Sequence, residues 1–229
     1  MTLHEMIYHR KSCRSFTGKP VDADMIEKIL SFELKPLYPQ IGVRVDIVSR
    51  DQVKCVCPWT TPQLITIYSE ETGGYLENIG FLFQQMDLYL QTLGLGVCWL
   101  GLGRMNPRTA AAVEGMKFVI MLAFGHPKGD QLRHEGKGFR RKAMELITDR
   151  ADPRLEPARL APSAVNSQPW YFTHEGDTIH VYCSRKGSPL DAGIALAHLY
   201  AANTETFRFF RAENVTAVPG CGYIGSVRL

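Results

Sequence analysis

The sequence predicts a globular protein that combines α-helices with β-strands, and three observations lead to this prediction. The 229 residues are 45% hydrophobic and carry a formal net charge of only +3, which supports a packed core and argues against disorder as the main state. Residues 76–93 place apolar side chains at intervals of three and four, the period of an amphipathic helix. Residues 43–47 alternate apolar and charged side chains, the period of a half-buried strand.

The first part of the chain contains most of the predicted elements. Its periodic segments predict helices over 2–10, 21–30 and 76–93, a short helix over 107–113, and strands over 43–47, 64–68 and 118–124. Asp22 or Asp24 is expected to cap the second helix, and Gly94 to end the long one in a left-handed conformation. Gly125 to Pro127 stop the apolar strand that precedes them.

A basic, glycine-containing stretch at 128–142 separates this part from a second series of elements. Helices are predicted over 152–160 and 191–210, a hairpin over 171–174 and 178–183, and terminal strands over 215–218 and 223–229. The pattern therefore indicates a boundary near residues 128–142, after which a second series of helices and strands starts.

Composition and motif content exclude several classes of protein. The mild charge does not indicate a nucleic-acid partner, because such binding needs a concentrated basic face. No segment approaches the roughly 20 apolar residues needed to cross a membrane, and the N-terminus has no signal region, so a cytoplasmic protein is expected. Cys55 and Cys57 have the wrong spacing for a zinc site and the histidines are dispersed, so no metal is expected. The cysteines are expected to be free, mostly buried thiols.

Four clusters carry candidate chemistry, and the first is the basic segment 10–16. Arg10 and Arg14 can hold a phosphate bidentately, and the hydroxyl of Ser12 can add a neutral hydrogen bond. A solvated basic turn is the commoner explanation of such a segment when it is taken alone.

The second cluster is the glycine-rich segment 94–103. It lacks the arrangement of a dinucleotide-binding fingerprint, because a helix precedes it and Trp99 stands where the third glycine belongs. A tight glycine turn followed by an extended segment, whose backbone N–H groups approach a ligand, fits better. A plain connection between helix and strand is the alternative.

The third cluster is the loop at 162–172, where serine, asparagine and glutamine lie between two prolines and beside aromatic residues. Such a loop presents donors and acceptors to a polar heteroaromatic ring and its polyol tail, and the alternative is a capped turn beside a core tryptophan. The fourth cluster is the basic triplet 140–142, which supplies a further phosphate cation or is an exposed linker; taken alone, a linker is favoured.

Together these clusters resemble the FMN-dependent nitroreductase family. Segment 10–16 is similar to that family's Arg-Arg-Ser-x-Arg-x-Phe start, and segment 162–170 to its Pro-Ser-x-x-Asn-x-Gln-Pro-Trp loop. Segment 94–101 resembles its Gly-Leu-Gly-x-x-Trp-x-Gly segment, and residues 118–127 its penultimate strand with Gly-x-Pro. The resemblance implies an α+β fold with a mixed or antiparallel sheet flanked by helices.

The order of the motifs departs from the ordinary family pattern. The asparagine loop usually follows the arginine start closely, whereas here it comes about 150 residues later, and residues 31–42 occupy its usual place without a match. The chain therefore resembles a branch with two related halves in one chain, over 1–135 and 136–229, packed as one globular unit. The halves would act as the two subunits of the common homodimer, so a monomer is favoured and a homodimer stays possible.

The resemblance also implies bound FMN, with NADH or NADPH as electron donor and a small-molecule electron acceptor such as a nitro compound or quinone. The implied reaction is a ping-pong transfer of two electrons through flavin N5. The cofactor-binding residues implied by motif match are Arg10, Lys11, Ser12, Arg14, Leu100, Gly101, Arg140, Arg141, Pro162, Ser163, Asn166 and Gln168. No catalytic acid or base is assigned. A flavin-binding protein without efficient turnover, such as a sensor or storage module, is the main alternative, and a flavin-free interaction protein is a third.

Overall fold

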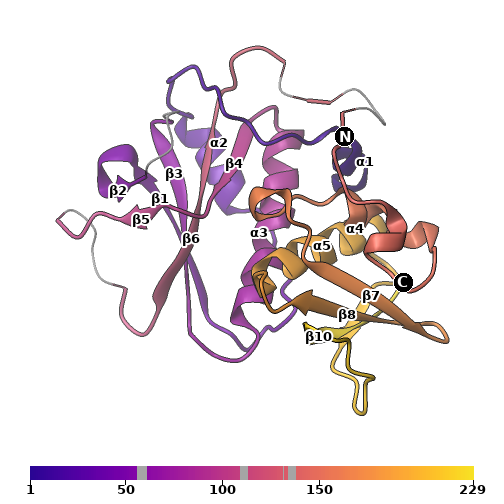
Figure 1. The fold of residues 1–229 in the computed structure, drawn as a ribbon. Coiled ribbons are helices and arrows are strands. Elements are labelled where there is room, and N and C mark those ends of the chain that lie inside the picture. The colour runs from indigo at the N-terminus through magenta and orange to yellow at the C-terminus, as the bar shows by residue number, and fades with distance from the viewer. Residues whose placement is uncertain (56–60, 109–112, 131, 134–137) are drawn as a thin grey trace.

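A computed structural model of the chain describes residues 1–55, 61–108, 113–130, 132–133 and 138–229 (Figure 1). Two long helices, α3 (Tyr75–Thr92) and α5 (Pro189–Ala202), lie in the middle of the molecule, with one four-stranded sheet on each side of the pair (Figure 1). The α+β fold with antiparallel sheets and flanking helices is thus confirmed.

The first sheet has the strand order β1-β3-β6-β4, and every neighbouring pair is antiparallel. Its strands are β1 (Val43–Ser49), β3 (Gln63–Ser69), β6 (Lys117–Gly125) and β4 (Gly96–Leu100). The apolar run predicted as a central strand lies in β6, where both edges find partners. Two short strands, β2 (Val53–Lys54) and β5 (Arg104–Met105), pair with each other beside this sheet.

The second sheet has the order β7-β8-β10-β9, again wholly antiparallel. Its strands are β7 (Trp170–Glu175), β8 (Thr178–Ser184), β10 (Cys221–Arg228) and β9 (Arg208–Phe210). In each sheet, counted along the chain, the first strand pairs with the second, the second with the fourth and the fourth with the third. In each sheet the long helix also comes between the second and third strands.

The two long helices cross at glycines. A Cβ atom on Gly80 would lie 2.0 Å from the carbonyl oxygen of Leu190, and one on Gly193 would lie 2.0 Å from that of Glu77. The backbones therefore touch at the crossing, and only glycine fits there. The hydrophobic core that surrounds the crossing joins residues of both helices and both sheets.

Shorter helices complete the fold near the N-terminus and before the second sheet. Helix α1 (Leu3–His9) begins with a capping box between Thr2 and Glu5, and α2 (Ala23–Leu30) is capped by Asp22. Helix α4 (Glu156–Leu160) and the 3-10 turns η1 (Arg50–Gln52), η2 (Met144–Leu146), η3 (Pro153–Leu155) and η4 (Ala164–Asn166) are the remaining helical pieces of the described chain.

One predicted element is too long and another is absent. The helix predicted over 191–210 ends at Ala202, because Asn203 turns its own side chain back to the carbonyl of Leu199 and starts a turn that leads to β9. Residues 215–218 form no strand, because β9 already occupies the free edge of β10. The helix predicted over 107–113 lies largely outside the described residues.

Two further observations concern the state of the cysteines and the length and hydrophobicity of the helices. The five described cysteines are all free, and Cys13, Cys98 and Cys183 are buried, whereas Cys57 lies outside the described residues. Across the described part of the chain, no helix has both the length and the apolar character needed to span a bilayer.

Candidate cofactor site

One pocket, of about 440 Å³, is lined by residues from distant parts of the chain. Its lining residues are Arg10, Lys11, Ser12, Arg14, Arg133, Gly138, Arg140, Arg141, Pro162, Ser163, Val165 and Asn166. The fold therefore brings the basic segment after α1, the basic stretch near 140 and the asparagine loop to one place.

The basic segment is held against the first sheet and α3 through its backbone. Ser12 forms an isolated parallel bridge with Val97 of β4, and the Cys13 N–H donates to the Val97 carbonyl at 2.8 Å. The Lys11 N–H donates to the side-chain oxygen of Gln91 at 3.0 Å. These contacts fix the path of the segment while the side chains of Lys11 and Arg14 stay exposed to solvent.

Arg10 differs from the other cations because it is buried. Its side chain is 2% exposed, and Nε donates to Oδ1 of Asp87 at 3.1 Å, with Asp87 itself 0% exposed. Nη2 of Arg10 lies 3.4 Å from Asp87 Oδ2 and 3.4 Å from the Ser12 hydroxyl. Arg10 thus combines a buried ion pair with a place in the pocket wall.

The asparagine loop has an unusual backbone. Val165, Asn166 and Gln168 have φ angles of 46°, 57° and 43°, in the left-handed region that residues other than glycine rarely adopt. Val165 is also 98% exposed, so its strained conformation buries no apolar surface within the chain. Strain of this kind costs of order 1–3 kcal/mol per residue and gathers at functional sites, so the loop is a site candidate on its geometry alone.

Two hydrogen bonds from backbone N–H groups to side chains hold this loop in place. The Gln168 N–H donates to the Ser163 hydroxyl at 2.9 Å, and the Ala164 N–H donates to Oδ1 of Asp191 at 2.9 Å. Asp191 lies in the first turn of α5 and is buried, which raises the pKa of its carboxyl. The loop conformation is thereby linked to the position of α5.

The basic stretch near 140 contacts the same loop directly. Nη1 of Arg141 donates to Oδ1 of Asn166, and Nδ2 of Asn166 donates to the Arg140 carbonyl at 2.7 Å. Nε of Arg141 donates to the Leu160 carbonyl at 3.2 Å. These contacts orient the Asn166 side chain and place the guanidinium of Arg141 at the pocket.

Three residues named from the sequence lie outside the lining of this pocket. Gln168 is fully buried, and its amide accepts from the Lys142 N–H at 2.6 Å and donates to the Arg159 carbonyl at 2.8 Å. Leu100 is buried in a cluster on the first sheet, and Gly101 follows it on the surface.

Arg133 lines the pocket and was missed by motif matching. Its N–H donates to the His9 carbonyl at 2.7 Å, and Nε donates to the Arg10 carbonyl at 3.3 Å. Its guanidinium lies over the Phe139 ring, 4.6 Å from the centroid. The only signal in the sequence was its place in the basic stretch 128–142.

The cations of the pocket repel one another. Burial, and then the positive charges of Arg10, Arg133 and Arg159, together lower the pKa of Arg141 to about 10. Burial, and then the charge of Arg10, lower the pKa of Arg133 as well. Six of the lining residues are Arg or Lys and none is acidic, so an anionic ligand would stabilise this pocket.

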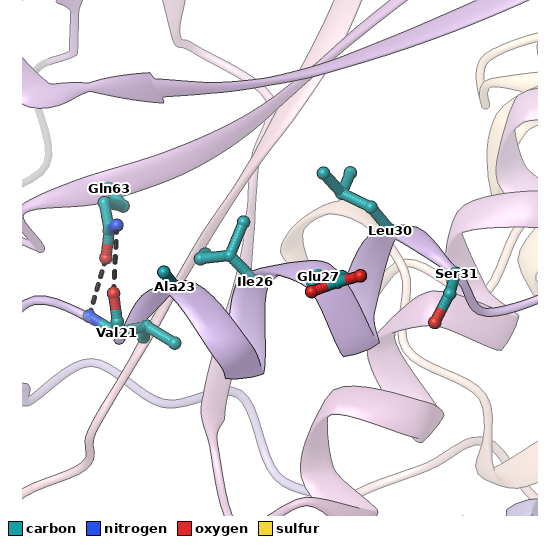
Figure 2. Close-up of a pocket in the computed structure, with 7 residues that line it drawn as sticks. All are labelled: Val21, Ala23, Ile26, Glu27, Leu30, Ser31 and Gln63. Atoms are coloured by element: carbon teal, nitrogen blue, oxygen red, sulfur yellow. Dashed lines mark hydrogen bonds between the residues drawn. The ribbon is translucent and has the colours of Figure 1, made fainter.

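A second pocket, of about 680 Å³, lies along α2 and has a different character (Figure 2). Its wall includes Ile26 and Leu30, and Glu27 is its one charged lining residue. The Gln63 amide is already bonded to the backbone N–H and carbonyl of Val21, at 2.7 and 3.3 Å (Figure 2). This pocket offers no set of donors for an anion.

Metal binding finds no support in the described ranges. In them no three His, Cys, Asp or Glu side chains are grouped so that they could hold a metal ion.

The structure is thus that of an α+β protein with two four-stranded antiparallel sheets and a pocket whose lining holds six Arg and Lys residues and no acidic one. The chain belongs to the nitroreductase family described as "Putative TM nitroreductase", whose family model matches residues 2–203. A comparison with curated proteins finds no match.

A solved structure shares this fold at low sequence identity, and two others resemble part of it. A structure described as a putative nitroreductase from Thermotoga maritima is 20% identical, with a TM-score of 0.69 over 99% of this chain and 92% of that chain. A nitroreductase with bound FMN from Desulfitobacterium hafniense is 15% identical, with a TM-score of 0.45 over 60% of this chain and 95% of that chain. An FMN-dependent nitroreductase from Clostridium difficile is 16% identical, with a TM-score of 0.46 over 62% of this chain and 98% of that chain.

Proposed function

We propose that this chain is an FMN-dependent oxidoreductase that takes electrons from NADH or NADPH and passes them to a nitro compound, a quinone or a similar small acceptor. The observation that carries the proposal is the pocket in which the basic segment 10–14 meets the asparagine loop. These two segments lie about 150 residues apart in the sequence, and each resembles a motif of the nitroreductase family, whose model matches this chain.

The donor set of this pocket fits a phosphate monoester at one end. Arg10, Lys11 and Arg14 supply cations, and Ser12 supplies a hydroxyl. Arg140 and Arg141, which contact the asparagine loop, add positive charge to the same lining. The pocket volume of about 440 Å³ is within the range of small-molecule sites.

The asparagine loop supplies groups of the same lining that suit a polyol and a polar ring. Ser163 and Asn166 bring a hydroxyl and an amide, and Pro162 and Val165 bring apolar surface. Leu100 and Gly101 enter the proposal through their backbone N–H groups near the ring. Leu100 lies three residues beyond Val97, which pairs with Ser12, so it is roughly 10 Å along β4 from the phosphate end. Gln168 would contribute indirectly, because its buried amide holds the asparagine loop in place through hydrogen bonds to Lys142 and Arg159.

The protein's part in the reaction is binding and orientation. FMN, when bound, supplies the two-electron chemistry, a ping-pong exchange through its N5 atom between nicotinamide donor and acceptor. The basic wall holds the phosphate, the strained asparagine loop orients the ring, and no side chain is assigned a proton-transfer role.

We further propose that the chain consists of two related halves, 1–135 and 136–229. The identical strand order of the two sheets and the equivalent place of α3 and α5 support this proposal. The reciprocal contact of Gly80 and Gly193 at the helix crossing is what a twofold relation between the halves would produce. The first half would then supply the arginine start of one shared site, and the second half its asparagine loop.

The decisive experiment is to purify the protein and record its visible spectrum, then add NADH or NADPH without oxygen. We expect a yellow protein that releases FMN on denaturation and whose flavin absorbance is bleached rapidly by at least one of the two donors. Bound FMN that neither donor reduces would instead support a sensor or storage protein. A protein that binds no FMN, even when FMN is added, would overturn the proposal.

A further inference from the structure

We propose that Asp87 and Gln91 of α3 are positioning residues for the phosphate end of the pocket, and that they make the site selective for a phosphorylated flavin over an unphosphorylated one. This inference rests on the proposed function, because it takes FMN as the ligand. Neither residue lines the pocket, and neither belongs to a motif that indicated the site.

The two residues stand one helical turn apart and act on adjacent residues of the basic segment. Asp87 accepts from the Arg10 side chain, and Gln91 accepts from the Lys11 backbone N–H at 3.0 Å. Nε2 of Gln91 also donates to Oδ1 of Asp87 at 2.6 Å. One connected network therefore fixes both a side chain and the backbone of the segment.

Burial makes this network rigid. Asp87 is 0% exposed, Gln91 is 3% exposed and Arg10 is 2% exposed. Charged hydrogen bonds away from water are stronger than those at the surface, and a buried charge without a partner is costly. Arg10 is consequently confined to one orientation, in which it forms part of the pocket wall.

The same network leaves donors of Arg10 available to a ligand. Nε and Nη2 are engaged by Asp87 and Ser12. Within the described residues, the two N–H groups of Nη1 have no partner. A guanidinium held on one edge by a carboxylate can present its other edge to a phosphate, which requires planar, directed donors.

Charge and geometry predict opposite effects of removing the carboxylate. Asp87 is a negative charge close to the site, so its removal would strengthen phosphate binding if only the summed charge mattered. If Asp87 orients Arg10, its removal weakens phosphate binding, because Arg10 loses its fixed geometry. The direction of the change therefore separates a positioning role from a simple electrostatic effect.

The test measures the affinities of FMN and riboflavin for the purified apoprotein, since riboflavin lacks only the phosphate. For Asp87→Asn we expect FMN affinity to fall at least tenfold while riboflavin affinity changes less than twofold. For Gln91→Met, which removes both amide contacts at similar length, we expect FMN affinity to fall at least threefold with riboflavin unchanged. Glu77→Gln is the matched control: Glu77 is another buried carboxyl of α3, 7% exposed, and this variant should keep the FMN-to-riboflavin ratio of the parent.

The outcomes separate the two proposals. FMN affinity that is unchanged or higher in Asp87→Asn overturns the positioning role. If Asp87→Asn does not fold, Gln91→Met decides alone, and an unchanged FMN-to-riboflavin ratio overturns the role. Equal losses of FMN and riboflavin affinity indicate general damage to the fold and also count against it. A parent protein that binds neither flavin contradicts the proposed function itself.

Discussion

Arg10 and Arg14 are the two arginines of the basic segment 10–16, but the fold gives their side chains different environments. Arg14 is exposed on the pocket wall, whereas Arg10 shares a buried ion pair with Asp87. The first can be removed without disturbing the core. Loss of the second leaves a buried carboxylate without its partner, which costs about 3–5 kcal/mol in comparable cases.

Single alanine variants should separate these roles. Arg14→Ala should lower FMN affinity about tenfold or more, because a charge-assisted hydrogen bond contributes about 1.5–3 kcal/mol and 1.4 kcal/mol is tenfold. Its melting temperature should match that of the parent. Arg10→Ala should lower both FMN affinity and the melting temperature. Flavin titration and thermal unfolding of the apoproteins measure both effects, and an Arg14→Ala protein that binds FMN like the parent would remove Arg14 from the site.

A partly buried group of charged side chains outside the site predicts a loss of stability in acid. His174 lies between two carboxylates, with Nδ1 2.6 Å from Asp149 Oδ1 and Nε2 3.1 Å from Asp152 Oδ2. Hydrogen bonds from Arg154, and then from His174, lower the pKa of Asp152 to about 2 from an ordinary value of 3.8. Because the folded pKa is the lower one, this stabilisation is complete above about pH 4 and is lost as the pH falls towards 2.

Asp152→Asn tests this pH dependence. At pH 7 the variant should be about 1–2 kcal/mol less stable than the parent, since Arg154 is partly exposed and its pairing is weakened by solvent. The difference should shrink between pH 4 and pH 2 as the parent's carboxyl is protonated. Urea unfolding at several pH values measures it, and a difference independent of pH would assign the effect to packing.

At the scale of elements, the crossing of α3 and α5 is the contact on which the arrangement of the site depends. Helix α3 holds the basic segment through Asp87 and Gln91, and α5 holds the asparagine loop through Asp191. A change in the distance between these helices would therefore move the two walls of the pocket relative to each other.

Gly80→Ala should damage this crossing. The new methyl group would lie 2.0 Å from the Leu190 carbonyl oxygen, a backbone atom that cannot move alone, so we expect a loss of about 3 kcal/mol in unfolding free energy. Gly222→Ala is the control, because no atom lies within 4 Å of its added methyl group. Chemical denaturation compares the two, and equal stability of both variants would show that the helices separate without cost.

At the scale of the whole molecule, the two four-stranded sheets have the same topology, but the segments that precede their first strands differ. The backbone of the segment before β1 is held by side chains of α3, whereas the asparagine loop precedes β7. Asn78 accepts from the N–H groups of Leu37 and Tyr38, and Gln85 bonds both backbone groups of Lys35. It has no serine or asparagine matching those of the loop in the second half.

We therefore predict one FMN per chain, bound by a monomer. The internal partner half would cover the surface that a homodimer buries, so a second chain is unnecessary. Native mass spectrometry of the 25.7 kDa chain should show one flavin on the monomer. Two flavins per chain, or flavin retained only in a dimer, would contradict the proposal of two related halves.

Much of this fold follows from local patterns in the sequence. The helical period of α3, the alternation in β1, the apolar run of β6 and the turn between β7 and β8 are each contained within a few neighbouring residues. Backbone hydrogen bonding and the burial of one face act over the same short range, so these elements could be predicted. The motifs at 10–16 and 162–170 could be found for the same reason. The end of α5 could not, because apolar residues return at 207–210 after the polar residues 203–206, while the backbone already turns at Asn203.

The tertiary structure decided what these segments do together. The sequence alone determined which residue types are present at 10–16 and 162–170. It did not determine that Arg10 is buried against Asp87, that the Gln168 amide is buried and hydrogen-bonded within the protein, or that Arg133 lines the pocket. Most of the contacts behind those outcomes join residues more than 20 positions apart. Such contacts are set by how distant segments of the chain pack together, and no local period in the chain encodes which side chains that packing brings within hydrogen-bonding distance.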